Sequence, residues 1–352
     1  MITLAALTLA CLGADDPLAR SDCLVGVYYF AGWWREQPNK WTIGGKDWRP
    51  DYPGRVPLLG EYNDQETMDG EIAAAAKYGV DFFQILWYPV DPQKPPEPQA
   101  ARLNDGLRTF LASPNARLIK FTIEAVNHAP FSIPTDEGWE DACREWVAAM
   151  KHAGYLRVGG RPVFKMHTIS GFYEQCGRDQ SLVERRLRTL RRMARAAGVG
   201  NPLIGGGVYG GGADPSSAAP YDFLSSYMEL PNLPNREKPY PYETLIAHAE
   251  SLWRSYAKAT DKPYVPYVPA GWDPRPWKDP RCSFNLPTRG EWVDALARAG
   301  KALGADPKLG LPGRKALLIH AWNEFGEGGI VAPTKGDGYM KLEGIRAAFR
   351  DR

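Results

Sequence analysis

Residues 317–333 read Leu-Leu-Ile-His-Ala-Trp-Asn-Glu-Phe-Gly-Glu-Gly-Gly-Ile-Val-Ala-Pro. The apolar run at residues 316–319 has no helical period, which predicts a short buried strand. Polar residues begin where this strand ends. Glu324 and Glu327 lie three residues apart in a glycine-rich loop beside a tryptophan. Two neighbouring carboxylates in such a setting predict an acid/base site, and the alternative is a pair of ordinary exposed loop charges.

Seven further apolar segments precede this strand, and each predicts a strand of its own. They span residues 24–30, 80–88, 118–123, 162–166, 202–208, 221–228 and 264–268. Helical periodicity follows most of them, although residues 213–219 are too short and too rich in Pro, Gly and Ser for a proper helix. Eight alternating units predict an α/β protein of the (β/α)8 TIM-barrel type, with residues 22–352 as a single catalytic domain with enlarged βα loops.

A doubly wound open sheet is the alternative architecture. Such a sheet normally carries a phosphate-binding loop early in the chain, and this sequence has none there. The glycines at 205–207 and 210–212 lack the Lys and Ser/Thr of a P-loop. We therefore interpret them as flexible or closely packed backbone.

Two helix starts carry a capping-box pattern. Asn63 is followed three residues later by Glu66, and Thr288 is followed by Glu291. A side chain at the first of these positions caps the backbone N–H groups of the first turn. Both pairs therefore predict where a helix begins.

Polar and aromatic residues stand at or just beyond the ends of the predicted strands. In a barrel these ends meet at one rim, where active sites of this fold are found. We therefore predict Glu324 and Glu327 as catalytic residues within a ring of substrate-binding residues. That ring comprises Tyr28, Trp33, Trp87, Glu124, His167, Glu229, Trp272, Asp273, Trp322 and Asn323. Glu124 fits substrate binding or a structural ion pair equally well, and His167 fits a bond to a sugar hydroxyl or to the backbone.

The composition narrows the class of ligand. The chain has 352 residues, 44% of them hydrophobic and 24% charged, and its net charge of +2 gives no electrostatic reason to expect a nucleic-acid partner. Its 12 Trp and 17 Tyr residues favour stacking on sugar rings, so we expect an oligo- or polysaccharide substrate. No cluster has metal-ligand spacing, and no metal or cofactor is predicted.

The first 14 residues resemble a short signal peptide, although they lack a basic start. This apolar run is too short for a membrane span. We therefore expect a secreted or periplasmic protein. Without Cys11 of the leader, four cysteines remain, and they allow three pairings.

Residues 322–328 form the pattern W-N-E-x-x-E-G. This pattern resembles the signature of the glycoside hydrolase family 99-like and WbsX-like proteins. Further segments that match the group are residues 28–30 with Trp33, residues 59–62, residues 85–88, residues 271–274, and residues 338–339 followed by 342–343. The resemblance covers nearly the whole chain after the leader.

The resemblance implies a (β/α)8 barrel and retaining, endo-acting cleavage of α-mannosides without a metal. It implies that Glu324 removes the proton of the 2-hydroxyl, so that a 1,2-anhydro sugar forms, and that Glu327 protonates the leaving oxygen. For this role burial against Trp322 and the charge of Glu324 are expected to raise the pKa of Glu327. The sequence departs from the characterised enzymes at Phe325 and Gly326, which places mannose specificity in question.

Other functions remain open at this point. α-Rhamnosides share the geometry of the 2-hydroxyl with α-mannosides. A conventional double displacement needs a nucleophile such as Glu124 or Glu229. WbsX-like relatives suggest a glycosyltransferase of polysaccharide assembly, and a barrel that binds carbohydrate without catalysis is a third alternative.

Overall fold

The computed structural model describes residues 22–90 and 101–351. The predicted leader, residues 1–14, lies outside the described residues. In the described part, no helix is both long and apolar enough to cross a membrane.

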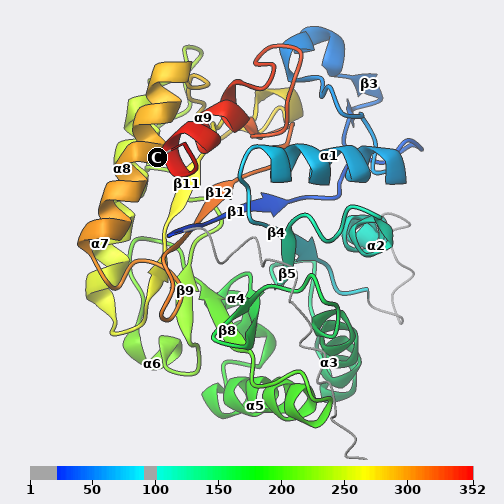
Figure 1. Cartoon of the computed structure of the whole chain (residues 1–352), viewed down its shortest axis with the longest axis vertical. Helices are drawn as coiled ribbons and strands as arrows, with labels where there is room; N and C mark the ends of the chain where they lie inside the picture. The colour runs from blue at the N-terminus through cyan, green and yellow to red at the C-terminus, as the bar shows by residue number, and fades with distance from the viewer. Residues whose placement is uncertain (1–21, 91–100, 352) are drawn as a thin grey trace, which may run out of the picture.

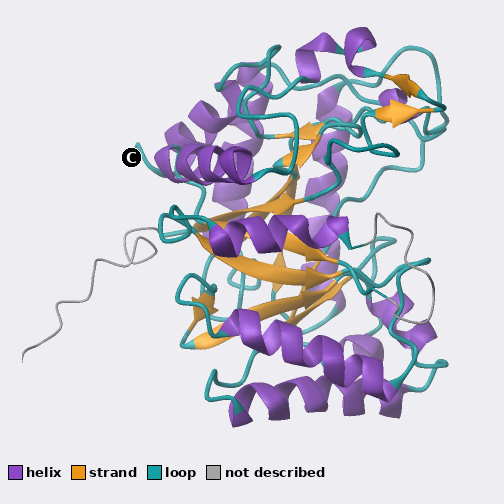
Figure 2. Cartoon of the chain, turned by 90° about the vertical axis from the view of Figure 1, so that its right-hand side faces the viewer, coloured by secondary structure: helices purple, strands orange, loops and turns teal. Residues whose placement is uncertain are grey.

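Eight parallel strand segments form the centre of the molecule, and helices surround them (Figures 1 and 2). Each segment overlaps one of the predicted strands. The strands are β1 (Leu24–Tyr29), β4 (Phe82–Trp87), β5 (Lys120–Ala125), β7 (Arg161–Met166), β8 (Leu203–Gly207), β9 (Phe223–Ser225), β10 (Tyr264–Val265) with β11 (Tyr267–Pro269), and β12 (Ala316–His320).

The sheet is a nearly closed parallel barrel because its two ends meet in one segment. The strand order is β10-β9-β8-β7-β5-β4-β1-β12-β11, and β10 and β11 are separated only by Pro266. Proline has no N–H to donate, so it interrupts the ladder. Its carbonyl still accepts a bond of 3.0 Å from the N–H of Leu318 on β12. The prediction of a TIM-type barrel is thus confirmed, and the open doubly wound sheet is wrong.

Helices connect the strands on the outside of the barrel. They are α1 (Gln65–Lys77), α2 (Asp105–Ala112), α3 (Asp136–Met150), α4 (Ile169–Gln175), α5 (Gln180–Ala196), α6 (Pro215–Ala218), α7 (Tyr242–Ala259), α8 (Arg289–Ala305) and α9 (Met340–Phe349). Figure 1 shows α3 beside α5, and α8 beside α9. The fifth crossover holds only the four residues of α6, as its composition predicted.

The predicted helix starts are right in one case and displaced in the other. Thr288 and Glu291 form the complete capping box of α8. At α1 the cap is Asp64, whose carboxylate accepts the N–H of Thr67, so the prediction of Asn63 was wrong by one residue. The Asn63 side chain instead donates to the carbonyl of Ala31, because it faces the loop after β1.

Aromatic rings fill the barrel interior and require glycine opposite them. A Cβ on Gly205 would stand 2.4 Å from the ring of Phe223, and a Cβ on Gly207 would stand 1.6 Å from the carbonyl oxygen of His167. Any side chain at these positions would collide with its neighbour. The glycines of β8 are therefore closely packed backbone, as interpreted from the sequence.

Candidate active site

The loop after β12 carries both predicted catalytic glutamates on one small hairpin. Its strands are β13 (Asn323–Glu324) and β14 (Gly329–Ile330). The N–H groups of Glu327 and Gly328 donate to the carbonyl of Glu324 at 3.1 and 2.9 Å, which closes the turn. Gly328 has a φ of +82°, a conformation that glycine adopts without strain. The turn thus fixes the two carboxylates relative to each other.

A cavity of about 960 Å³ lies over this hairpin. Glu324 and Glu327 line it together with Tyr227, Trp272 and Trp277. Its volume lies at the upper end of the range for small-molecule sites, which is roughly 300–1,000 Å³. Aromatic faces beside hydrogen-bonding groups suit a ligand with apolar ring faces and polar edges.

Burial raises the pKa values of both glutamates. The pKa of Glu324 lies well above its ordinary value, first because burial disfavours the charged form and then because Glu327 is close. Burial raises the pKa of Glu327 to about 7, against the opposing charge of Arg281. The raised pKa expected for Glu327 is thus present, but burial and the charge of Asp279 raise it in place of the expected charge of Glu324.

Each glutamate has its own partner. The hydroxyl of Tyr227 donates to Oε1 of Glu324 at 2.5 Å, and the guanidinium of Arg281 lies 3.3 Å from Oε1 of Glu327. His320, fully buried behind the turn, places Nε2 3.8 Å from Oε2 of Glu327. Burial lowers the pKa of His320 to about 3, so its ring is neutral at physiological pH. The pair is therefore held by a phenol and a cation, and the neutral imidazole lies behind Glu327 beyond hydrogen-bond distance.

A second buried carboxylate, Glu124, lies under the cavity wall. Its oxygens accept bonds from Nζ of Lys165 at 3.0 Å, from Nδ1 of His167 at 2.6 Å and from the amide of Gln84. Burial opposes ionisation of Glu124, but these partners outweigh it and lower its pKa. Nε2 of His167 faces the hydroxyl of Tyr209 at 3.2 Å on the cavity wall. Of the two interpretations of Glu124, the ion pair is what the structure contains.

Four of the twelve predicted site residues line the cavity, and the others lie around or beneath it. The lining residues are His167, Trp272, Glu324 and Glu327. The residues outside the lining are Tyr28, Trp33, Trp87, Glu124, Glu229, Asp273, Trp322 and Asn323, all of them buried.

The tryptophans among these residues are packed, although their positions in loops suggested exposure. Trp33 is 1% exposed and donates its indole N–H to the carbonyl of Asn323 at 2.8 Å. Trp87 donates to Glu145 and packs edge-on against Trp146. Trp322 is fully buried and packs against the ring of Phe83. The expectation of loop tryptophans that stack on sugar from the surface is therefore corrected, because these rings form the layer beneath the site.

The remaining polar residues are occupied by protein partners. The amide oxygen of Asn323 accepts the N–H of Phe30 at 2.9 Å, which ties the hairpin to the end of β1. The hydroxyl of Tyr28 donates to the carbonyl of Ser226 at 2.8 Å. These bonds hold the ends of β1 and β9 in the positions that the cavity wall requires.

Two acidic residues are likewise used within the protein. Asp273 pairs with Arg55 and Arg275, and its side chain is only 6% exposed. Glu229 accepts bonds from the hydroxyls of Ser226 and Tyr256 at 2.6 and 2.7 Å. Neither Glu229 nor Glu124 lines the cavity, so neither is placed as the nucleophile of a double displacement.

Several cavity residues were absent from the sequence prediction. Tyr88 and Tyr227 follow the ends of β4 and β9, so the strand-end pattern that selected their neighbours also applied to them. Lys40, Trp277 and Arg281 come from long irregular loops, where no periodicity indicates which side chain faces the site.

Comparison with known proteins supports the fold. No family model matches the chain, and no curated protein matches it in sequence. Several solved structures do match the chain. A glycoside hydrolase-like protein aligns over 94% of this chain and 95% of its own, with a TM-score of 0.63 and 15% identity. The GH99 endo-α-mannosidase from Bacteroides thetaiotaomicron, in complex with bis-tris propane, aligns over 93% and 97%, with a TM-score of 0.55 and 16% identity.

The chain has a TIM-barrel-like glycoside hydrolase fold. A second structure of the same mannosidase gives a TM-score of 0.53 at 14% identity, over 92% of this chain and 95% of that chain. The resemblance inferred from the sequence pattern is therefore matched by similarity of the folded chain. At such identities the likeness concerns the fold, and the chemistry must be argued from the side chains.

Proposed function

We propose that this protein is a retaining glycoside hydrolase that cleaves α-linked, manno-configured glycans within the chain. The observation that carries the proposal is the hairpin that presents Glu324 and Glu327, both with raised pKa values, to one aromatic cavity. Glycoside hydrolysis uses two carboxyl groups, and one of them must hold a proton near neutral pH.

The proposed reaction has two displacements at the anomeric carbon. Glu324 accepts the proton of the 2-hydroxyl while that oxygen attacks C1, and Glu327 donates its proton to the leaving glycosidic oxygen. A 1,2-anhydro sugar results. Water then attacks C1 as Glu327 takes its proton, the bond from C1 to the 2-oxygen breaks, and Glu324 returns the proton to that oxygen. Two inversions give net retention.

The manno configuration suits this route because its 2-hydroxyl and α-linked leaving group are trans and both axial. Tyr227 donates to Glu324 and lowers its pKa, which offsets part of the rise that burial and Glu327 cause, in the direction that a base requires. The pKa of about 7 at Glu327 matches an acid that works near neutral pH. An exported location, proposed from the leader, agrees with a glycan substrate outside the cell and offers no nucleotide-sugar donor for a transferase.

The test is a panel of α-mannans and α-rhamnan oligosaccharides, with product size read by chromatography and the first product anomer read by proton NMR. We expect internal cleavage with retention. Glu324→Gln and Glu327→Gln should each lower kcat by roughly 10²–10⁴-fold. Glu66→Gln is the matched control, because Glu66 is exposed on α1, away from the cavity.

Two results contradict the proposal. Turnover by both cavity variants at the wild-type rate excludes the pair as the acid and base. An inverted first product excludes the anhydro-sugar route. Binding of the glycans without any turnover by the wild-type protein favours the non-catalytic alternative.

A further inference from the structure

A lysine ammonium group forms part of the cavity wall beside the proposed catalytic pair. Lys40 is half-buried, and its Nζ lies 5.6 Å from the centre of the Trp277 ring, which also lines the cavity. Throughout residues 22–90 and 101–351, no carboxylate lies within ion-pair distance of Lys40. The other strong cation of the wall, Arg281, is matched by Asp279 through bonds of 2.6–3.0 Å. Lys40 thus brings a positive charge that no carboxylate of the described residues neutralises.

The backbone of Lys40 is held in place by the two elements that flank it. Its carbonyl accepts the indole N–H groups of Trp48 at 2.9 Å and Trp277 at 3.1 Å. One of these tryptophans belongs to the loop after β1 and the other to the loop after β11. The two bonds therefore connect the Lys40 backbone to a neighbouring tryptophan of its own loop and to Trp277 of the cavity wall.

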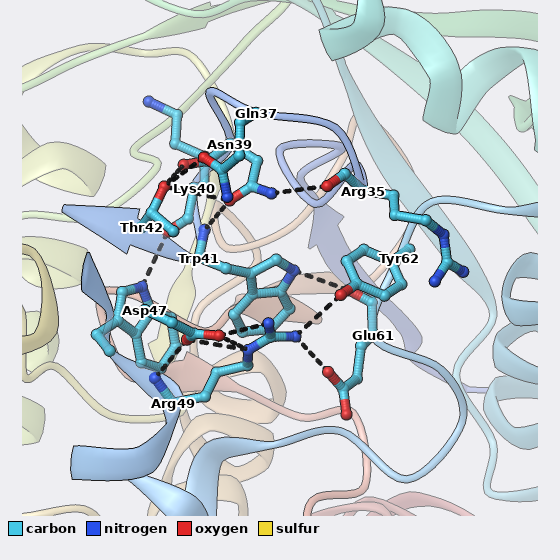
Figure 3. A network of polar contacts seen from close by, with 11 residues as sticks. Arg35, Gln37, Asn39, Lys40, Trp41, Thr42, Asp47, Arg49, Glu61 and Tyr62 are labelled. Atoms are coloured by element: carbon cyan, nitrogen blue, oxygen red, sulfur yellow. Dashed lines mark hydrogen bonds and ion pairs between the residues drawn. The ribbon is translucent and has the colours of Figure 1, made fainter. Parts of the chain in front are cut away.

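A network of polar contacts stiffens the loop that carries Lys40. Figure 3 shows Arg49 at its centre, where it bonds to both oxygens of Asp47 and to Glu61 and Tyr62. The Trp41 indole adds a bond of 2.9 Å to the Glu61 carbonyl. In the same view the Lys40 side chain extends away from these carboxylates. The charges of Arg49, Asp47 and Glu61 are thus paired within the loop, whereas the Lys40 ammonium faces the cavity.

The positive charge of Lys40 opposes the proton that the catalytic pair must hold. Lys40 and Arg281 both lower the pKa values of Glu324 and Glu327, against the effect of burial. With a neutral substrate this charge would favour loss of the acid's proton. An anion bound at Lys40 cancels the charge, so the proton would be held more firmly once substrate is bound.

We propose that the substrate glycan carries an anionic group, a sulfate ester or a uronic acid carboxylate, and that Lys40 binds it while the sugar stacks on Trp277. This inference rests on the proposed hydrolase function and names its substrate class. Charge-assisted hydrogen bonds from an ammonium group to such oxygens are stronger than bonds between neutral groups. Because Lys40 lies beside the acid/base pair, recognition of the anion is linked to catalysis.

The experiment compares matched polymers that differ only in the anion. One pair is a sulfated α-glycan and its desulfated form, and the other is a uronate-containing α-glycan and its carboxyl-reduced form. We expect kcat/KM to be at least about tenfold higher for the anionic member of one pair. The pair that shows the preference identifies the anion. The preference should decline as salt is added, because salt screens a partly exposed charge.

Lys40→Met should abolish this preference by lowering kcat/KM for the anionic polymer to the value for its neutral partner. Lys46→Met is the matched control, because Lys46 is exposed on β3 (Lys46–Asp47) in the same loop and pairs with Asp51. Thermal unfolding of both variants checks that they fold. Equal kcat/KM within both pairs for the wild-type protein, or equal losses on both members in Lys40→Met, would overturn the proposal.

A binding measurement separates this inference from the hydrolase proposal. The Glu327→Gln variant is titrated calorimetrically with the same four polymers. Tighter binding of an anionic polymer that no form of the protein cleaves would support the role of Lys40 and contradict hydrolysis. Cleavage of neutral and anionic polymers at equal rates would support hydrolysis and contradict the role of Lys40.

Discussion

Glu124 and Glu324 are both buried in the same barrel, yet their pKa values move in opposite directions. Glu124 is 0% exposed and has a lowered pKa, whereas Glu324 is 5% exposed and has a raised one. Burial disfavours the charged form of both glutamates. The difference lies in their partners, since Glu124 faces Lys165 and His167 while Glu324 faces a tyrosine hydroxyl and another glutamate.

This comparison shows how one barrel keeps one carboxylate charged and makes another available for proton transfer. A paired charge is fixed by its partners and holds the wall of the site in place. A buried carboxyl group whose main partners are a hydroxyl and a second carboxyl group keeps its proton to a higher pH, which makes the proton available for acid/base chemistry. Partners, and not depth, therefore distinguish the structural carboxylate from the proposed catalytic one.

The largest expected effect is on the free energy of unfolding, when the carboxylates of Glu124 and Glu324 are each replaced. Glu124→Gln leaves the ammonium of Lys165 buried without its counter-charge, so we expect a loss of about 3–5 kcal/mol in the free energy of unfolding. Glu324→Gln removes a carboxyl group whose raised pKa shows that folding disfavours its charged form, so at pH 8 it should leave the stability unchanged or raise it. Urea unfolding followed by circular dichroism measures both. Similar losses in the two variants would mean that the partners do not distinguish these residues.

A third buried carboxylate extends the comparison. Glu71 is 3% exposed, accepts the hydroxyl of Tyr29 at 2.7 Å, and has a pKa raised by burial from 4.5 to about 7. The folded state therefore binds the proton more tightly than the unfolded state, and this group makes stability fall as pH rises from about 4.5 to 7. Glu71→Gln should remove that fall.

The expected gain for Glu71→Gln is about 3 kcal/mol at pH 8, with little change at pH 4. Unfolding curves at the two pH values provide the measurement. Asp222 serves as the contrasting site. Against burial, the N–H of Ile204 and the guanidinium groups of Arg191 and Arg161 hold its pKa below the ordinary value, so Asp222→Asn should destabilise the protein at pH 8. A stabilising Asp222→Asn variant would contradict the rule that partners decide the sign.

The smallest effect concerns the pH dependence of activity. If Glu327 is the acid, activity is lost as pH rises through its pKa of about 7. Arg281 favours the charged form, so Arg281→Gln should raise this pKa and move the basic limb of the profile upward by roughly one pH unit. Arg275→Gln is the control, because Arg275 pairs with Asp273 outside the cavity lining. If the basic limb of the profile does not move in Arg281→Gln, Glu327 is not the group whose titration produces it.

Much of the fold could be read from local pattern. Apolar runs bounded by turn residues identify the strands, because a strand buried on both faces needs little else. The paired glutamates of residues 322–328 were found because their spacing and their strand-end position lie within one short stretch. The cap of α1 was misplaced by one residue because Asn63 and Asp64 are both good caps, and only the contact to Ala31 decides between them.

The sequence by itself determined the eight strand segments, their order and the loop with Glu324 and Glu327, because each depends on residues close together in the chain; the hairpin formed by that loop was seen only in the structure. Only the tertiary structure decided which side chains face the cavity and which carry a charge. Trp33 is buried against aromatic rings from distant segments of the chain. Trp277, also far along the chain, holds Lys40 in the cavity wall. Burial and partners set each pKa, and both come from segments that meet only when the barrel closes.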